Sequence, residues 1–392
     1  MRDWPMQVSL RDLRAVYDPE MHHAMLEDAP RNRFYAACLR NHAGEIRGRP
    51  VLDLGAGTGV LCAFALRVAG AGEAHAVEAL PEMCRLIPDL LAPALSADEH
   101  SRLLVHCGFG EDLCARPPDA WPKQGVAALV SEWLGVMALN EGMISPLLAC
   151  RDSFPEQPRM LPGGLRIWVQ LARSAPETAV PGRCGPVAVE ASSLVGEPVL
   201  ILDADLQSCK FSDLFEQPAV PIDVPCADVR GLVGWFDLLC CKVHADTVLS
   251  TAPGSAETHW AQCWMPLDSL APHPGKMEVA MRLAPAGGPA QEGCDRGAGL
   301  PELAVELTVR GTDAQARSAL FLLDSGLCEY AGQAAKRHCC ARQTQRADVR
   351  TEVEPRKVGE AANTEDVEVR FFPSDILGLQ GLLKKAMNMC EN

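Results

Sequence analysis

Long apolar runs are missing from this 392-residue sequence, and no uninterrupted stretch reaches the length needed to cross a bilayer. The first residues also lack a charged segment followed by an apolar one, so neither secretion nor membrane insertion is expected. Positive charge is in deficit as well, because 36 Lys and Arg stand against 51 Asp and Glu, which gives a net charge of −15. That balance opposes nonspecific binding to nucleic acid and favours a cationic partner.

Cysteine pairs of the C-x-x-C type are also missing. The 17 cysteines are scattered through apolar segments of a long chain, which is typical of reduced thiols rather than of a disulfide framework. We therefore expect a cytoplasmic or nuclear protein. The run His338-Cys339-Cys340 lies beside Lys336 and Arg337, which favours an exposed polar loop, and no metal site is predicted.

The first part of the sequence alternates helices with strands. Residues 12–40 carry apolar positions at helical spacing, which predicts one or two helices in an N-terminal cover over residues 1–48. Residues 49–163 follow a β-α-β pattern, which predicts a parallel sheet in a nucleotide-binding domain. Its strands are expected at 51–54, 75–78, 103–106 and 126–130.

After residue 163 the pattern changes to short β-rich runs separated by Pro and Gly turns. Residues 164–392 are therefore predicted to form an antiparallel barrel or sandwich. Residues 284–300 and 331–365 are polar or rich in charge and are expected as variable surface loops. An amphipathic C-terminal helix from Pro373 is expected to pack on the core. The strands are predicted at 165–171, 199–202, 232–239, 260–265, 277–283, 303–309 and 319–323.

A glycine loop occupies the first strand-to-helix turn. Gly55, Gly57 and Gly59 allow a tight turn and a close approach of the backbone to a ligand. Glu78 ends the next predicted strand, where a carboxylate accepts hydrogen bonds from ribose hydroxyls. The G-x-G-x-G spacing, with no Gly-Lys-Ser/Thr after it, weakens a dinucleotide or triphosphate interpretation. With Asp53 before it, the loop resembles the first motif of class I methyltransferases, which bind S-adenosylmethionine.

Two glutamates follow this loop, at positions 132 and 141. A guanidinium is a planar cation with five N–H donors, and carboxylates hold it well because they accept bidentate hydrogen bonds. Taken alone, Glu132 and Glu141 are as compatible with ordinary loop or cap positions. Beside a methyl donor, the segments Ser131–Gly135 and Glu141–Met143 resemble the double-glutamate loop of protein arginine N-methyltransferases.

Two more segments are similar to that family. Thr258-His259-Trp260 resembles its threonine-histidine-tryptophan barrel loop, and Met25 to Tyr35 resembles its cofactor-covering helix. With the glycine loop, these matches span residues 17–283 in the family's order. The resemblance implies an α/β + β fold, with N-terminal helices and a Rossmann-like class I methyltransferase domain followed by an antiparallel β-barrel.

The resemblance also implies a role for each matched residue. Glu132 and Glu141 would clamp the substrate guanidinium. His259 would bond Asp28 and close the site, either as a proton acceptor or as a hydrogen bond between domains. Contacts with substrate would come from Met25, Met143 and Trp260.

The implied cofactor is S-adenosylmethionine. Arg31 would pair with its methionine carboxylate, Glu78 would hold its ribose, and Glu111 would approach its adenine. The full set of cofactor-binding residues is Arg31, Asp53, Gly55, Gly57, Gly59, Glu78 and Glu111.

Two departures leave the number of transferred methyl groups open. Residues 12–16 stand where dimethylating members carry a tyrosine pair, and Gly142 stands where they carry serine. Protein arginine monomethylation and dimethylation are therefore both compatible with the sequence. Two other interpretations stay open, a small-molecule methyltransferase on the same fold and a catalytically weak regulatory partner of a related methyltransferase.

The expected partners are arginine-containing proteins, such as Arg/Gly-rich segments or histone tails, with no direct nucleic acid or membrane partner. The resemblance also implies a homodimer. Family members insert a helical dimerisation arm between the positions of Val169 and Pro198, and the Pro and Gly content there does not favour such a helix.

Overall fold

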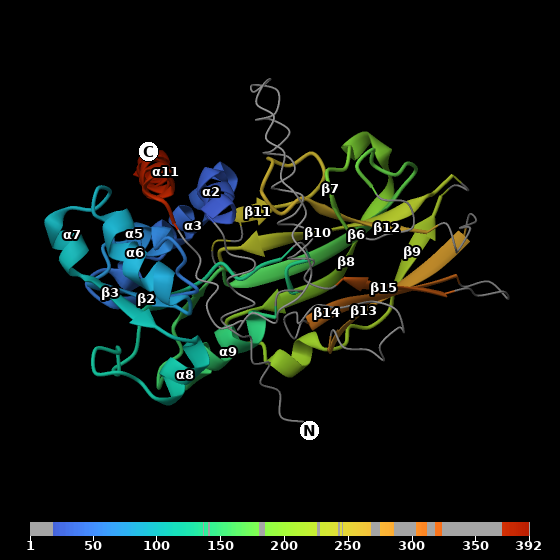
Figure 1. Cartoon of the computed structure of the whole chain (residues 1–392). Helices are drawn as coiled ribbons and strands as arrows, with labels where there is room; N and C mark the ends of the chain where they lie inside the picture. The colour runs from blue at the N-terminus through green and yellow to red at the C-terminus, as the bar shows by residue number, and fades with distance from the viewer. Residues whose placement is uncertain are drawn as a thin grey trace, which may run out of the picture.

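The computed structural model describes residues 19–135, 137–139, 142–179, 185–225, 228–241, 244, 246–267, 275–285, 303–311, 318–323 and 371–391. They form two parts that lie side by side, one built on a parallel sheet with helices and the other built almost wholly of antiparallel strands (Figure 1). The predicted fold class is thereby confirmed.

The first part is a five-stranded parallel sheet in the order β3-β2-β1-β4-β5. Strands β2 and β3 follow β1 on one side of the sheet, whereas β4 and β5 lie on the other, so the strand order reverses between β1 and β4. In open α/β sheets, ligands bind at the carboxyl ends of the strands beside such a switch point. Its strands are β1 (Pro50–Leu54), β2 (Glu73–Glu78), β3 (Leu103–Cys107), β4 (Ala128–Val130) and β5 (Arg159–Leu161). Its helices are α2 (Pro19–Glu27), α3 (Ala29–Asn41), α4 (Ala43–Ile46), α5 (Val60–Arg67), α6 (Pro81–Leu91), α7 (Ala97–Ser101), α8 (Gly110–Ala115) and α9 (Ile144–Ser153).

Local sequence explains where several of these helices begin. Asp28 caps α3, since its carboxylate accepts the N–H of Arg31 at 2.9 Å, and Pro30 suits the first turn, which needs no amide donor. Ser96 and Glu99 form a reciprocal capping box at the start of α7. Helix α5 begins directly after Gly59, so its N-terminal amides face the glycine loop.

The second part, called the barrel below, has two antiparallel sheets, and β8 lies against β9 and β13 where the sheets meet. One sheet runs β7-β12-β10-β6-β8 with β11 paired to β10, and the other runs β15-β14-β13-β9. The strands are β6 (Gly164–Ala172), β7 (Gly185–Val187), β8 (Leu194–Asp205), β9 (Val220–Val224), β10 (Gly231–Leu239), β11 (Val248–Ser250), β12 (Gln262–Pro266), β13 (Gly275–Pro285), β14 (Leu303–Gly311) and β15 (Ser318–Leu323). The short 3-10 helices are η2 (Ala191–Ser193) and η3 (Phe211–Leu214).

Alternating burial defines the inner face of these strands. In β13 the residues Met277, Val279, Met281 and Leu283 are buried, while Glu278 between them is exposed. This period of two is the expected pattern of a half-buried strand. These buried side chains belong to a hydrophobic core that also includes the sheet of the first part, so the two parts share one core.

Sequence patterns located most strands of the two parts within a few residues but missed four, β5 of the parallel sheet and β7, β9 and β11 of the second part. Strands β7 and β9 contain Pro186 and Pro221, which argue against a strand, and β11 has only three residues. In the region of the family's dimerisation arm, the described residues form β7 and η2 and no α-helix. Residues 286–300 and 331–365 of the predicted loops lie outside the described residues, and β13 reaches into the first loop as far as Pro285.

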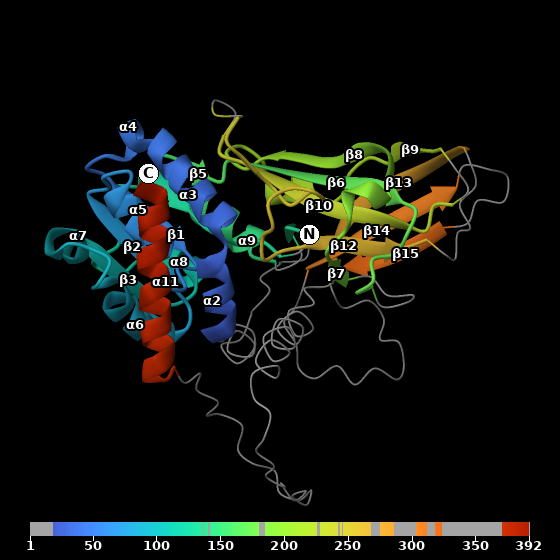
Figure 2. The same ribbon diagram turned by 90° about the horizontal axis from the view of Figure 1, so that it is seen from above.

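Helix α11 (Pro373–Glu391) lies against the first part of the molecule, although its sequence position placed it with the barrel. It runs beside α2 and α6 and also contacts α3 and α5 (Figure 2). Leu379, Leu383 and Met387 are buried, so the amphipathic helix packs on the core as predicted. Helix α2, which opens the described chain, is therefore covered by the helix that ends it.

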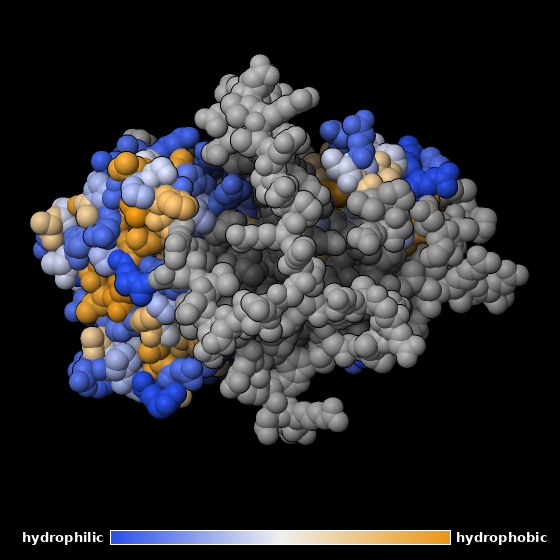
Figure 3. All heavy atoms as spheres, viewed as in Figure 1, coloured by the Kyte–Doolittle hydropathy of each residue, from blue (hydrophilic) through white to orange (hydrophobic). Residues whose placement is uncertain are grey.

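Apolar patches lie among hydrophilic residues on the face of the first part seen in Figure 3. Among the described residues, the large apolar side chains that remain exposed are Val248, Phe372 and Leu377. Two of the three belong to α11 or its approach, so one side of this helix stays in contact with solvent. None of the described helices combines the length and apolar character required to span a membrane.

The substitution Gly231→Ala tests the packing of β10 against β12. A Cβ at Gly231 would lie 2.1 Å from the tip of the buried Trp264 ring, so the indole or the strand must move. We expect a loss of about 1–3 kcal/mol in the free energy of unfolding, measured by chemical denaturation. Gly44→Ala is the matched control because nothing lies within 4 Å of the new methyl group, and it should be neutral or slightly stabilising.

Candidate active site

The glycine loop joins β1 to α5 in a conformation that requires glycine. Gly55, Gly57 and Gly59 have φ angles of +77°, +53° and +78°, which other residues rarely adopt. The carboxylate of Glu78 lies against this loop, because it accepts the N–H of Gly57 at 2.8 Å and that of Leu80 at 2.8 Å. Burial raises the pKa of Glu78, partly offset by these amides. Since carboxylate oxygens accept several hydrogen bonds, Glu78 retains capacity for ribose hydroxyls.

Arg31 extends from α3 toward the segment that follows β4. Its Nη2 donates to Oε2 of Glu132 at 3.2 Å, and its Nη1 donates to the carbonyl of Met25 at 3.3 Å and to Oδ1 of Asn32 at 3.1 Å. The Nε of Arg31 is buried and has no hydrogen-bond partner among the described residues. A buried guanidinium with an unused donor suits the carboxylate of a ligand.

Glu132 is held in a defined orientation by the chain around it. Ser131 donates through Oγ to the carbonyl of Leu54 at 2.6 Å, and the carbonyl of Ser131 accepts the hydroxyl of Tyr35 at 3.1 Å. The Oε1 of Glu132 accepts the N–H of Leu134 at 3.0 Å, and its side chain is only 10% exposed. Because Leu54 directly precedes the glycine loop, these bonds place the Glu132 carboxylate at the edge of that loop.

The second glutamate of the predicted clamp, Glu141, lies outside the described residues, so its position stays a prediction. Gly142 is described and has a φ of +73°, which suits glycine. The side chain of Met143 lies at the glycine loop, with its Cε 3.6 Å from where a Cβ on Gly55 would stand. The chain has therefore returned to the loop by Met143.

The barrel closes the site through two residues that precede β12. Oδ2 of Asp28 accepts both the backbone N–H of His259 at 2.9 Å and its ring Nδ1 at 2.7 Å. Burial would raise the pKa of Asp28, but the bonds from His259 and Arg31 outweigh it and hold that pKa below its ordinary value. Trp260 donates through Nε1 to the carbonyl of Leu134 at 2.7 Å. The barrel thus fastens both the covering helices and the Glu132 segment.

This chain is similar in sequence to known proteins over part of its length. Residues 171–284 match the arginine methyltransferase oligomerization subdomain. The chain is 31% identical over 274 residues to a probable histone-arginine methyltransferase 1.3 of Arabidopsis thaliana. This alignment covers 61% of this chain and 48% of that relative. Over these regions the chain is similar to protein arginine N-methyltransferases. It spans about half the length of that Arabidopsis relative.

Solved structures of the family share the fold of this chain. Arabidopsis thaliana protein arginine methyltransferase 10 aligns with a TM-score of 0.61 at 18% identity, over 77% of this chain and 97% of that one. The PRMT1 enzyme–prozyme heterotetramer of Trypanosoma brucei with AdoHcy aligns with a TM-score of 0.60 at 20% identity, over 77% and 98%. At these identities the likeness establishes the architecture, and site roles rest on the geometry above.

For Trp260, Asp53 and Glu111, the structure gives less direct support for the roles predicted from the family pattern. Trp260 is 2% exposed and packs edge-on against Phe236, so its position favours bracing the Glu132 segment over contact with substrate. Asp53 has no exposed surface, and burial raises its pKa to about 7. Glu111 is exposed in the first turn of α8. The roles assigned to these residues stay predictions.

Sequence patterns missed His22, which the structure brings to the glycine loop. Its imidazole lies 3.5 Å from where a Cβ on Gly57 would stand, so the ring covers the loop from α2. Burial, and then the charge of Arg31, lowers the pKa of His22 to about 4, which keeps the ring neutral at pH 7. The available signal was its spacing of three residues before Met25, which puts both on one side of the helix.

Proposed function

We propose that this chain is an S-adenosylmethionine-dependent protein arginine N-methyltransferase that forms monomethylarginine, with dimethylarginine as a second product. The observation that carries the proposal is the buried contact between Arg31 and Glu132 at the edge of the glycine loop. A cofactor bound along this loop and a substrate guanidinium would then both be within reach of the Glu132 carboxylate. The complex of the Trypanosoma brucei relative with AdoHcy supports the choice of methyl donor.

The site residues fit such a cofactor. The glycine loop admits close approach of a ligand, Glu78 offers acceptors for ribose hydroxyls, and the unused Nε of Arg31 offers a donor for a carboxylate. S-adenosylmethionine supplies an electrophilic methyl group on sulfur. The task left to the protein is to bind the arginine side chain and orient its attacking nitrogen.

Positioning is the main catalytic contribution available to these residues. A guanidinium has a pKa of about 13.8, so it does not lose its proton freely near neutrality, and its lone pairs are delocalised. A carboxylate fixed at its far nitrogens concentrates positive charge there and leaves the near nitrogen richer in electrons and aligned for attack. Glu132 is suited to this role because Arg31 and the N–H of Leu134 already fix its orientation.

His259, at the boundary of the two parts, is the proposed acceptor of the proton released after transfer. His259 donates its Nδ1–H to Asp28, which leaves Nε2 as the ring nitrogen that accepts a proton. The negative charge of Asp28 stabilises the imidazolium that forms. The same hydrogen bond joins the barrel to the covering helices, so the pair has a structural role as well.

Proteins with exposed arginines, such as Arg/Gly-rich segments or histone tails, are the substrates that the acidic chain suits best. A homodimer is part of the proposal, supported by the match to an oligomerization subdomain. A cytoplasmic or nuclear location is supported by the scatter of the 17 cysteines through apolar segments, which is typical of reduced thiols.

The decisive experiment incubates the purified chain with methyl-labelled S-adenosylmethionine and an Arg/Gly-rich peptide, then separates monomethylated from dimethylated arginine. We expect label in monomethylarginine first, and none in a matched peptide with lysine in place of arginine. Transfer to small molecules but not to peptide would support the alternative of a small-molecule methyltransferase. Absence of label from the chain alone, with stimulation of a related catalytic subunit, would support a regulatory partner instead.

A further inference from the structure

Three potential metal ligands meet where helix α3 reaches the barrel. His42 follows the last turn of α3, and Cys241 and His244 lie in the turn between β10 and β11. One ligand atom from each of the three lies within 4.8 Å of the others. These residues are distant in sequence and belong to the two different parts of the molecule, so the fold assembles the cluster.

The cluster is shielded from solvent and consists of nitrogen and sulfur ligands. His42 is 3% exposed and Cys241 is 6% exposed, while His244 is half-buried. The rings of His42 and His244 meet edge to face with centroids 5.3 Å apart. A further thiol, Cys240, is buried with its Sγ 3.8 Å from Nδ1 of His42. Neutral imidazole and thiolate are the ligands preferred by zinc, whereas magnesium and calcium prefer oxygen.

Hydrogen bonds around the cluster orient its ligands as in established metal sites. Nδ1 of His42 lies 3.0 Å from the carbonyl of Cys38 and donates to it, which leaves the lone pair of Nε2 for an ion. Metal-binding histidines commonly donate their second nitrogen in this way. The backbone N–H of His244 points at Sγ of Cys241 at 3.4 Å, a donor that stabilises a thiolate.

We propose that His42, Cys241 and His244 bind one Zn²⁺ ion that joins helix α3 to the barrel. Ligand atoms around a tetrahedral zinc ion are about 3.3–3.6 Å apart, so small side-chain rotations close the cluster onto an ion. Three protein ligands with an exchangeable fourth position are an established zinc arrangement. Helix α3 is then fastened at both ends, by Asp28 with His259 at its start and by the ion at its end.

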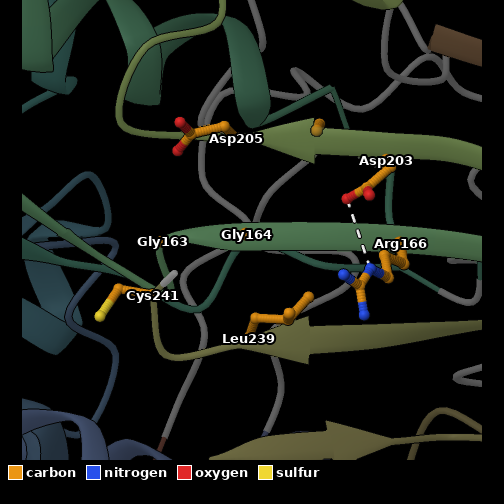
Figure 4. A pocket seen from close by; sticks show the side chains of 8 residues that line it. Gly163, Gly164, Arg166, Asp203, Asp205, Leu239 and Cys241 are labelled. Atoms are coloured by element: carbon orange, nitrogen blue, oxygen red, sulfur yellow. Dashed lines mark hydrogen bonds and ion pairs between the residues drawn. The ribbon is translucent and has the colours of Figure 1, made fainter. Parts of the chain in front are cut away.

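A neighbouring hollow borders this cluster on the side of Cys241. It has a volume of about 160 Å³, and the ends of β6, β8 and β10 line it together with Cys241. In Figure 4 the side chain of Cys241 stands at one end of the hollow and points away from Arg166 and Asp203, whose ion pair spans 3.4 Å. The thiol therefore borders the hollow without facing into it.

Metal analysis of the full-length chain tests the proposal directly. The purified protein, loaded with Zn²⁺ and then freed of loose metal by gel filtration, should retain about one equivalent per chain. Co²⁺ in its place should give the visible bands of a tetrahedral site and a thiolate-to-metal charge-transfer band. Chelation should lower the melting temperature, and Zn²⁺ but not Mg²⁺ should restore it.

Two single variants and one control assign the ligands. Cys241→Ser and His244→Ala should weaken Zn²⁺ affinity by more than about 100-fold, because loss of an outer-shell partner alone costs 10–100-fold. Cys107→Ser removes an exposed thiol elsewhere on the molecule and should bind as the wild type does. Equal retention by Cys241→Ser and the wild type, or no retained metal in a wild-type chain that is folded by circular dichroism, would overturn the proposal. These readouts do not depend on methyl transfer, and they hold whether or not the proposed activity is found.

Discussion

Glu132→Gln is expected to lower the rate of methyl transfer by about 10²–10³-fold, because it removes a preorganised charge from beside the reacting guanidinium. The amide has nearly the same shape as the carboxylate, and its single oxygen can still accept the N–H of Leu134, although the acceptor for Arg31 is lost. The fold and the affinity for the cofactor should therefore change little. Single-turnover rates on an Arg/Gly-rich peptide, together with cofactor binding by calorimetry, measure the two effects separately.

Glu156→Gln is the matched control. Glu156 is exposed and follows α9, so its substitution makes the same change in charge away from the site. Its transfer rate should equal that of the wild type. Equal rates in Glu132→Gln and the wild type would remove Glu132 from the catalytic site. A loss of cofactor affinity as large as the loss of rate would show instead that Glu132 acts by holding Arg31.

Of the substitutions proposed here, Asp28→Ala should destabilise the protein most, with an expected loss of about 3–5 kcal/mol in the free energy of unfolding. The carboxylate is nearly buried and accepts three hydrogen bonds, from the N–H of Arg31 and from the N–H and Nδ1 of His259. Its removal leaves α3 without a cap and the barrel loop without its partner. Asp28→Asn should retain more stability, since asparagine is as good a helix cap. Urea denaturation of the three proteins measures these differences.

Acid provides an independent measure of the same carboxylate. The pKa of Asp28 is below its ordinary value of 3.8, because bonds from His259 outweigh the effect of burial, so folding is favoured when it is charged. Its contribution is complete at neutral pH and is lost as the pH falls through the lowered pKa. Asp28→Asn should lack this part of the acid dependence.

Asp98→Ala is the control for the loss of stability in Asp28→Ala. Asp98 is an exposed aspartate paired with Arg102, so this variant should change the free energy of unfolding by less than about 0.5 kcal/mol. If Asp28→Ala lost no more unfolding free energy than Asp98→Ala, the proposed role of Asp28 in holding the His259 loop to α3 would be contradicted.

Local patterns were sufficient to predict the elements that build this site. The glycine spacing, the acidic end of β2 and the change to short β-rich runs after residue 163 each depend on residues close in sequence. Short elements were harder to predict, because β11 has three residues and β9 contains Pro221. A pattern of so few residues cannot distinguish a strand from a loop.

Contacts between distant residues were predictable only where a family motif already linked them. The bond from Asp28 to His259 belongs to that class. His22 over the glycine loop, and His42 beside Cys241, lacked such a motif. The spacing of His22 to Met25 indicated a shared side of the helix but not the glycine loop that it faces. The C-terminal helix showed the same limit, because its apolar stripe predicted that it packs on a core but not which part of the molecule it covers.

The position of α11 has a consequence for the order in which the chain folds during synthesis. Arg40 in α3 donates to the carbonyl of Cys390 in α11, across a sequence separation of 350 residues. At about 5–20 residues per second, a ribosome needs on the order of 20–70 s to make the intervening chain. The first sheet and its helices therefore remain without the buried side chains of α11, such as Leu379, Leu383 and Met387, until the whole barrel has been synthesised. A nascent chain halted before Pro373 should stay bound to chaperones, and release should follow only when α11 has emerged.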